Sequence, residues 1–441
     1  MATEQGDLFG KERISTVLRK IAPPVMLAQL IQSLYNLVDS FFVGLYSGDG
    51  LTALSVIYPL QLVAIALAVG TGVGVNTYMA RAYAHGGRKN AESAAGVGML
   101  LSLVSWAVFA AVSALIMPAY VRTSCSVPQA VRYAEIYGYI NCVGSIGVFL
   151  EGNWTKVHQS RGNMRRPMMA QIAGAVINII FDPILIFGAG MGVAGAALAT
   201  VIGQVSAALI VAPRAVCRPP KIAHIWHYVK RIYFFGYSSI FMQLLYTVYI
   251  LALNMILAGF SDAAVTVLGL YYKWQSLFFV PLFGLQTCIV PVLSYNYAIG
   301  QYDRCRQTMR FSFLISATFM VLGMVGFILF PEQLLRVFSD SAEVIAIGKV
   351  AFPIIGSGFI SAVFGLIMPS FFQALGMGLR SAFLALLRQL ICLVPIFWAF
   401  SLIGLDYTWL SFPISETVSG AVGLLLYALQ LRKWKREKEA T

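Results

Sequence analysis

The sequence is poor in charged residues and in the residue patterns that make up most catalytic and metal centres. Asp, Glu, Lys and Arg account for 11% of its 441 residues, whereas about 25% is usual for a soluble domain. Its six cysteines are scattered without a CxxC pair, and its four histidines lie in basic loops. This spacing favours neither a disulfide framework nor a zinc site. No nucleophile lies beside a base in a recognisable motif, so we expect neither an enzyme nor a bound cofactor.

Long apolar stretches dominate the sequence instead. Hydrophobic residues make up 59% of the chain, and they gather in segments long enough to cross a bilayer as helices. We therefore predict an all-α membrane protein with twelve transmembrane helices. The first segment is too long for a signal peptide and has no small-residue cleavage site behind it, so we expect no cleaved leader. The twelve segments are 21–46, 52–80, 92–117, 128–153, 163–187, 192–212, 233–259, 264–298, 308–330, 341–373, 380–403 and 409–430.

The net charge of +13 comes from an excess of Lys and Arg, and the position of these residues is informative. Most lie in the two tails and in the even-numbered loops between the apolar segments. Basic residues concentrate on the cytoplasmic side of membrane proteins, so we expect both termini in the cytoplasm. The basic loops would then face anionic lipid. This dispersed pattern favours the lipid bilayer, and not nucleic acid, as their partner.

The two halves of the chain align with each other in one constant register. Gln29 aligns with Gln243 and Tyr35 with Tyr249, and the same register continues into the fifth segment of each half. Six helices in each half make the repeats parallel. We therefore expect two six-helix bundles related by a pseudo-two-fold axis along the membrane normal, an architecture typical of transporters. The predicted parts are an N-terminal lobe (1–213), a cytoplasmic linker (214–231) and a C-terminal lobe (232–441).

The first apolar segment carries a polar stripe that ends in an acid. Gln29, Gln32, Asn36 and Asp39 are spaced three or four residues apart, which places them on one helical face. Tyr35 lies beside this stripe, one turn before Asp39. An acid inside a membrane helix costs about 2.5 to 3.5 kcal/mol on insertion scales, so it is a candidate functional residue.

A second acid occurs in the fifth segment, in the sequence INIIFDPILIF. Asp182 lies four residues after Asn178, and the next residue, Pro183, removes one backbone hydrogen bond. The aligned positions of Asp39 and Asp182 in the second half are apolar. Two buried carboxyl groups in one bundle favour binding of a proton, or of Na⁺ by oxygen ligands. The alternative is two unrelated acids, each neutral and hydrogen-bonded.

Several stretches together resemble the MATE family (multidrug and toxic compound extrusion), especially its DinF-like and MepA-like bacterial members. These stretches are YNLVDSFFVG, NIIFDPILIFG, GMGVAGAALATVIGQ and VPLFGLQTCIVPVLSYNYAIGQYDRCR. The resemblance extends over all twelve segments. It implies a twelve-helix antiporter of the bacterial plasma (inner) membrane that works as a monomer. Such a protein exports amphipathic, mostly cationic drug-like compounds by alternating access, in exchange for H⁺ or Na⁺.

The resemblance also assigns roles to individual residues. It implies that Asp39 and Asp182 bind the coupling ion and that Pro24 is a hinge in the first helix. It implies polar partners for these acids: Asn178, Thr200, Tyr35 and Asn153. NorM-type members carry further acids on helices seven and ten, which this sequence lacks. We therefore expect coupling in the N-terminal lobe, by H⁺ or by Na⁺ held at Asp39, Asp182 and Asn178.

The expected substrate cavity lies between the lobes and is lined by the first two helices of each half. Aromatic side chains there would hold cationic compounds through adaptable contacts; packing in the helix core is the alternative for these residues. The candidate lining residues are Gln32, Tyr35, Asn36, Tyr58, Gln243, Tyr249 and Lys273.

Four charged residues in or near the apolar segments have roles that the sequence leaves open. Lys273 is either a counter-charge to an N-lobe acid or a side chain that extends towards the membrane surface. For Arg388 we favour a cap on a neighbouring helix end over a substrate contact. Glu151 and Glu416 have no assigned role.

A flippase for lipid-linked oligosaccharides from the same superfamily is the rival function. Its cavity should be cationic in order to hold a pyrophosphate, and many such flippases have more than twelve helices. The mixed intramembrane charge and the predicted count of twelve favour the antiporter.

Overall fold

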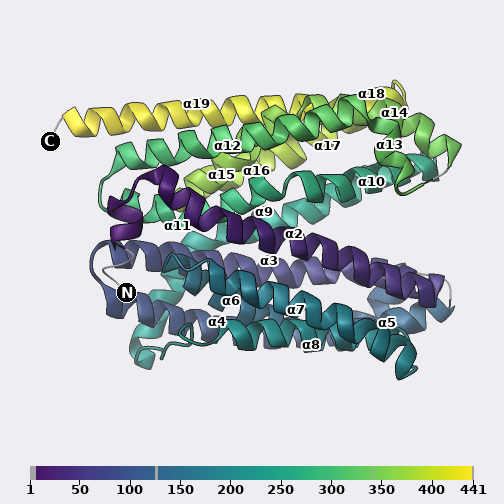
Figure 1. Cartoon of the computed structure of the whole chain (residues 1–441), viewed down its shortest axis with the longest axis horizontal. Coiled ribbons are helices and arrows are strands. Elements are labelled where there is room, and N and C mark those ends of the chain that lie inside the picture. The colour runs from purple at the N-terminus through teal and green to yellow at the C-terminus, as the bar shows by residue number, and fades with distance from the viewer. Residues whose placement is uncertain (1–5, 125–127, 340, 440–441) are drawn as a thin grey trace. The chain divides into compact units, whose positions relative to one another are not determined.

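The computed structural model describes residues 6–124, 128–339 and 341–439, and every regular element in this part of the chain is a helix (Figure 1). The chain divides into two compact units, unit 1 with residues 1–243 and unit 2 with residues 244–441. Their border lies inside one long helix, α9 (Ile222–Ala258). The predicted lobe borders stay a prediction.

The helices of unit 1 before α9 include two short π-helices, η1 and η2. In chain order they are η1 (Gly6–Lys11), α2 (Ile14–Tyr46), α3 (Gly48–Ala84), α4 (Arg88–Ser124), α5 (Pro128–Gly144), α6 (Ile146–Ser160), α7 (Arg165–Pro183), η2 (Ile184–Gly188) and α8 (Val193–Val211).

The helices of unit 2 that follow α9 are more often interrupted. They are α10 (Asp262–Phe278), α11 (Val280–Ala298), α12 (Tyr302–Leu329), α13 (Pro331–Arg336), α14 (Ala342–Ser357), α15 (Phe359–Ala374), α16 (Gly378–Leu386), η3 (Leu387–Leu393), α17 (Val394–Ser401), α18 (Leu405–Thr408) and α19 (Ser411–Glu439).

Most predicted segments correspond to helices that can span a membrane. Among the described residues, nine helices are long and apolar enough by themselves, and two bent pairs, α10 with α11 and α14 with α15, raise the number to eleven. The predicted fourth segment corresponds to α5 and α6, which are separated at Ser145. When the two halves are aligned in their common register, α5 and α6 coincide with the bent pair α14 and α15. The repeat therefore makes them the twelfth span, which agrees with the predicted fold class.

The internal repeat is visible in the backbone of each unit. Gly86 and its aligned residue Gly300 both have φ 71°, and the aligned Gly162 and Gly376 have φ 76° and 75°. Glycine adopts this left-handed conformation without strain. At each of the four positions the glycine N–H donates to the carbonyl three residues earlier. The same turns thus close the same helices in both units.

Two of the breaks that distinguish unit 2 from unit 1 lie next to a proline. The continuous helix α3 aligns with α10 and α11, which are bent by 54° at Phe279, just before Pro281. The continuous helix α4 aligns with α12 and α13, which are separated just before Pro331. Proline lacks a backbone N–H and is favoured in the first turn of a helix, which fits its place after both breaks, whereas Pro59 of α3 and Pro118 of α4 lie inside unbroken helices. The sequence prediction treated 264–298 as one uniform segment, whereas its segment 308–330 ended at the break and left α13 unassigned.

One predicted helix boundary is wrong by several turns. The segment predicted to start at 233 begins at Ile222, so the end of the predicted linker belongs to the first half of α9. This half packs in unit 1, where a Cβ atom added to Gly74 would clash with the carbonyl oxygen of Ile232. The prediction relied on the apolar residues of the second half, so it assigned the basic first turns of this helix to the linker.

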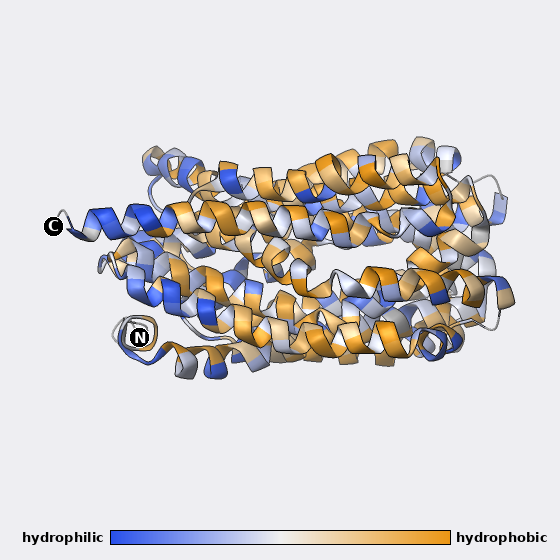
Figure 2. Cartoon of the chain, turned by 90° about the horizontal axis from the view of Figure 1, so that it is seen from above, coloured by the Kyte–Doolittle hydropathy of each residue, from blue (hydrophilic) through white to orange (hydrophobic). Residues whose placement is uncertain are grey.

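Hydrophobic residues cover the middle of the helices, and hydrophilic residues gather near their ends (Figure 2). The C-terminal end of α19 shows this change most clearly, because RKWKREKE follows its apolar part. A bilayer places apolar surface in its hydrocarbon core and charge at its interfaces. The structure therefore has the hydropathy expected of a multi-pass membrane protein.

Candidate functional site

Helices α7 and α8 of unit 1 approach each other closely at a pair of glycines. A Cβ atom added to Gly174 would lie 2.8 Å from the Gly203 carbonyl oxygen, and one added to Gly203 would lie 2.7 Å from the Gly174 carbonyl oxygen. Small residues permit such contacts between membrane helices. One turn away, the Asn178 Nδ2 of α7 donates a hydrogen bond to the Thr200 Oγ1 of α8 at 3.4 Å. The glycine contact thus fixes the distance across which these polar side chains meet.

The two predicted acids lie at this place. Asp182, one turn beyond Asn178, has an exposed fraction of 0%, and its Oδ1 accepts a hydrogen bond from Asn178 Nδ2 at 3.4 Å. Asp39 lies on α2, which packs against α7; it is 8% exposed and lies within electrostatic range of Asp182. Tyr35 lies within electrostatic range of both carboxyl groups. The structure therefore brings five predicted residues into one group, which we call the acid cluster: Tyr35, Asp39, Asn178, Asp182 and Thr200.

Several oxygens of the acid cluster lack a hydrogen-bond donor. Within the described part of the chain, Asp39 Oδ1, Asn178 Oδ1 and Asp182 Oδ2 are buried and have no partner. Neither acid forms an ion pair with a Lys or Arg of these residues. A buried carboxylate without compensation is costly, and carboxylate and amide oxygens suit hard cations. The cluster can therefore take up a proton or a small hard cation.

A cavity of about 320 Å³ adjoins the acid cluster inside unit 1. Such a volume is within the usual range for small-molecule pockets. Asn178 and Thr200 are part of its wall, whereas Asp39 and Asp182 are not among its lining residues. The acids therefore lie behind this wall, and Asn178 connects the cavity to Asp182. Four predicted substrate residues also line the cavity: Gln32, Tyr35, Asn36 and Tyr58.

Sequence reasoning missed some polar residues of the same cavity, such as Asn141 and Gln204, and left Glu151 without a role. Tyr137 lies behind the cavity wall: it is 2% exposed and accepts a hydrogen bond at 3.4 Å from the Nε2 of Gln61, which lines the cavity. Glu151 lines the cavity and accepts a hydrogen bond from Thr155 Oγ1 at 2.7 Å. Tyr137 and Asn141 are four residues apart in an apolar segment. That spacing was the available signal for a polar face on α5.

The remaining predicted site residues lie elsewhere. Asn153 is fully buried on α6, and its Oδ1 lies against Gly98 of α4; its amide has no hydrogen-bond partner among the described residues. Tyr249 is 3% exposed and packs against Tyr246 and Tyr272 with ring centroids 5.4 and 6.4 Å apart. This geometry fits the packing alternative for Tyr249.

Two further residues that were predicted to line the substrate cavity do not line the cavity of unit 1. Gln243 is half-buried at the end of unit 1 and does not line that cavity. Lys273 is exposed, with its Nζ 5.1 Å from the centre of the Phe338 ring in unit 2. This cation–π contact occupies the ammonium group and agrees with a side chain directed towards the helix end.

The predicted hinge lies in a continuous helix. Pro23 and Pro24 are both inside α2, which runs without a break from Ile14 to Tyr46. Two prolines remove two backbone hydrogen bonds from this turn, so it is the weakest part of the helix. The hinge role of Pro24 stays a prediction.

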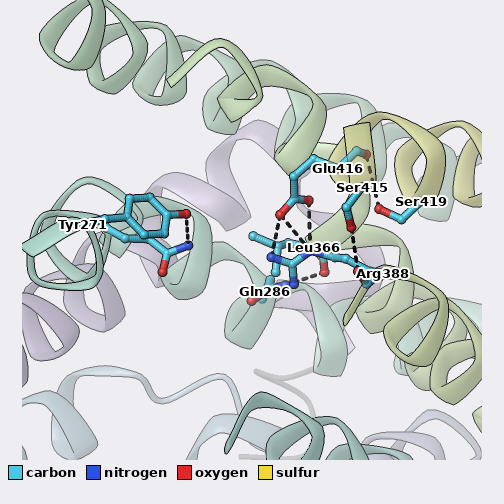
Figure 3. Close-up of polar contacts among 8 residues, drawn as sticks. Tyr271, Gln286, Leu366, Arg388, Ser415, Glu416 and Ser419 are labelled. Atoms are coloured by element: carbon cyan, nitrogen blue, oxygen red, sulfur yellow. Dashed lines mark hydrogen bonds and ion pairs between the residues drawn. The ribbon is translucent and has the colours of Figure 1, made fainter. Parts of the chain in front are cut away.

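Unit 2 contains a different polar centre, a buried ion pair (Figure 3). Arg388 of η3 donates from Nε to both carboxylate oxygens of Glu416 on α19 at 2.9 Å, and from Nη2 to Oε1 at 2.7 Å. The Ser415 hydroxyl donates to the Arg388 carbonyl oxygen at 2.6 Å. Side-chain exposure is 11% for Arg388 and 13% for Glu416. The expected helix-capping role of Arg388 is therefore wrong: its guanidinium binds a side-chain carboxylate.

Comparisons with known proteins agree with this architecture. The family model MatE matches residues 24–184 and again residues 238–398, two ranges that begin and end at aligned positions of the two halves. The multidrug export protein MepA of Staphylococcus saprophyticus is 23% identical over 97% of each chain. The probable multidrug resistance protein NorM of Thermotoga maritima is 24% identical over 77% of this chain and 75% of its own. A structure described as the outward-facing conformation of a multidrug resistance MATE family transporter has a TM-score of 0.91 at 23% identity, covering 98% of both chains.

Proposed function

Because the chain belongs to the MatE family, we propose that it is a membrane antiporter that exports small amphipathic compounds in exchange for H⁺ or Na⁺. The names of its relatives, MepA and NorM, support multidrug export as the activity. The preferred compounds are cationic, because the acids of unit 1 attract cations. We also propose that it works as a monomer in the bacterial inner membrane, with both termini in the cytoplasm and without a bound cofactor.

The acid cluster is the single observation that carries this proposal. Asp39 and Asp182 are buried near each other without a basic partner among the described residues. A permanent salt bridge would hold both carboxylates ionised and could not exchange an ion. Unpaired carboxyl and amide oxygens can instead bind a cation and release it.

The coupling step follows from charge. Ionised Asp39 and Asp182 attract a cationic compound in the adjoining cavity. Uptake of H⁺ or Na⁺ by one acid neutralises part of this charge and weakens that attraction, so the compound dissociates. Bending of α2 near Pro24 would move Asp39 with its helix and connect ion uptake to the change of access. After the ion leaves on the opposite side, the carboxylate is charged again and binds the next cation.

The flippase alternative receives no support from the cavity of unit 1. The charged residue that lines this cavity is Glu151, and no Lys or Arg among the described residues belongs to the cavity wall. A pyrophosphate would require basic side chains as hydrogen-bond donors. The cavity therefore suits a cation better than a lipid-linked pyrophosphate.

Transport by the purified full-length protein in proteoliposomes tests this function. A pH gradient and a Na⁺ gradient are imposed separately, and ethidium movement is followed by fluorescence. We expect one of the two gradients to drive export, Asp39→Asn to abolish it, and Asp406→Asn to leave it unchanged, because Asp406 is exposed on α18. Undiminished gradient-driven export by Asp39→Asn would rule out the proposed coupling.

A further inference from the structure

A second, larger cavity lies at the end of unit 1 where the basic loops meet, outside the apolar part of the helices. Its volume is about 1460 Å³. Its walls come from η1 and the start of α2, the turn from α3 into α4, the turn from α6 to α7, and the stretch between α8 and α9 with the first turns of α9. We call it the basic pocket. The acid cluster and its cavity have no residue in common with it.

The charge of the basic pocket is strongly unbalanced. Its acids are Glu12 and Glu92, and Glu92 is already paired with Arg88 at 2.8 Å. Six further cations of its wall have side chains without a hydrogen bond or ion pair to the described residues: Lys20, Lys89, Arg165, Arg214, Arg218 and Lys221.

Some exposed cations elsewhere in the structure have acidic partners, whereas others, such as Arg122 and Arg310, have none among the described residues. Arg336 and Lys349 share Glu332 at 2.8 Å each, and Lys433 lies 3.7 Å from Glu437. Like charges that converge without a counter-ion repel one another and raise the local concentration of anions. The gathering of six such cations around one cavity therefore favours an anion from outside the chain as their partner.

The loops that carry these cations are held in place. Arg161 donates to the Arg214 carbonyl oxygen and, from Nη2, to Cys217 Sγ at 3.4 Å. A Cβ atom added to Gly96 of α4 would lie 2.6 Å from Pro219 N, so the stretch between α8 and α9 packs directly on α4.

The start of α9 is fixed in the same way. The Tyr228 hydroxyl donates to Asn90 Oδ1 on α4 at 3.3 Å. The cations of the pocket wall therefore stand on fixed backbone, and a bound anion does not have to order them. Such pre-organisation favours binding.

We propose that the basic pocket binds a phosphate group, supplied by the headgroup of an anionic lipid. Arginine and lysine are the usual partners of phosphate, with arginine able to donate two parallel hydrogen bonds. The first turns of α9 favour a lipid as the source: Ile222 is 87% exposed and Trp226 is 64% exposed, next to the pocket residues Lys221 and His224. Tryptophan concentrates at membrane interfaces, and basic pockets beside membrane helices bind acidic headgroups. A soluble phosphate compound has the same chemistry and is distinguished by experiment.

Native mass spectrometry of the full-length protein in neutral detergent tests this site. Binding of dioleoyl-phosphatidylglycerol is compared with that of dioleoyl-phosphatidylcholine, each with and without inorganic pyrophosphate. The pocket variant Lys89→Gln/Arg165→Gln/Arg218→Gln is compared with the tail variant Lys433→Gln/Lys435→Gln/Arg436→Gln, which loses the same charge. We expect phosphatidylglycerol to be preferred, and its affinity to fall about tenfold or more in the pocket variant but less than about twofold in the tail variant.

The arms of the experiment separate the two phosphate sources. Retention of phosphatidylglycerol in excess pyrophosphate supports the lipid headgroup, and its displacement supports the same site with a soluble phosphate ligand. A charge-preserving variant, Lys89→Arg/Arg165→Lys/Arg218→Lys, should keep most of the affinity, which separates charge from misfolding. The proposal would be overturned if the pocket and tail variants lost the same affinity for phosphatidylglycerol. It would also be overturned if the wild type neither preferred phosphatidylglycerol over phosphatidylcholine nor bound pyrophosphate.

Discussion

At the scale of single residues, Thr200 is the point at which α8 joins the acid cluster. Its hydroxyl accepts a hydrogen bond from Asn178, whose Nδ2 also donates to Asp182. One amide group therefore serves two acceptors from two helices. Removal of the Thr200 acceptor should leave Asn178 free to rotate and change the oxygens that face a coupling ion.

We predict that Thr200→Val weakens ion coupling while the protein remains folded. Valine has the shape of threonine without its hydroxyl, so packing is kept, and loss of one hydrogen bond costs about 1 kcal/mol, or roughly a fivefold change in affinity. The concentration of H⁺ or Na⁺ that gives half-maximal export should rise by that factor, with little change in the KM for ethidium. Thr318→Val is the control, because the Thr318 hydroxyl is exposed and bonds only within its own helix. An equal effect of both changes would show that Thr200 has no role in the cluster.

At the scale of helices, the contact between α7 and α8 depends on the absence of two side chains. A methyl group on Gly203 would meet the Gly174 carbonyl oxygen at 2.7 Å and Asn178 Cβ at 3.0 Å. The first of these atoms is backbone and cannot rotate away. The helices would have to separate, and Asn178 would move away from Thr200.

We predict that Gly203→Ala lowers both stability and coupling. Overpacking of this kind costs about 1 to 3 kcal/mol, which a thermal melt of the detergent-purified protein will detect. Gly269→Ala is the matched control: a Cβ atom there has no neighbour within 4 Å, and alanine favours a helix over glycine by about 1 kcal/mol. Its melting temperature should stay the same or rise. An unchanged melting temperature and unchanged transport in Gly203→Ala would contradict the structural account of this contact.

The ion pair between η3 and α19 connects two elements of unit 2, and both partners are needed together. A Cβ atom added to Gly365 of α15 would lie 2.9 Å from Glu416 Oε2, so three helices enclose the pair. We predict that Arg388→Met alone destabilises the protein by about 3 to 5 kcal/mol, because it leaves a buried charge without a partner. The double change Arg388→Met/Glu416→Leu should recover most of that loss.

An exposed ion pair provides the comparison. Arg336 and Glu332 are 2.8 Å apart with side chains 56% and 34% exposed, and exposed pairs contribute about 0 to 1 kcal/mol. Melting temperatures of Arg336→Met, Arg388→Met and the double variant form the test. If Arg388→Met and Arg336→Met melted alike, the buried pair would have no special structural importance.

At the scale of the whole molecule, the sequence predicted the features that depend on composition and on short-range spacing. The polar stripe in the first segment, Gln32, Asn36 and Asp39, was sufficient to identify an acid as a site residue. The register of the repeat was sufficient to predict the order of the helices. The sequence did not predict the ion pair of Arg388 and Glu416, because their contact depends on how helices pack and not on local spacing. It also missed the bends, which depend on whether neighbouring helices support a break near proline. The match of the MatE model to both halves confirms the repeat independently.

The number of spans decides where the two termini lie, and α5 with α6 decides the number. Helix α5 contains 17 residues and α6 contains 15. At 1.5 Å per residue their summed length is about 48 Å, which exceeds the thickness of the hydrocarbon core, about 30 Å. If they cross the membrane, the chain has twelve spans and both termini share the cytoplasmic side; with eleven spans the termini would lie on opposite sides.

We predict that a green fluorescent protein fused to either terminus fluoresces in Escherichia coli, since this reporter matures in the cytoplasm, and that an alkaline phosphatase fused at the C-terminus is inactive. An active phosphatase at the C-terminus combined with a fluorescent N-terminal fusion would contradict the twelve-span fold and would remove the predicted parallel relation of the two repeats.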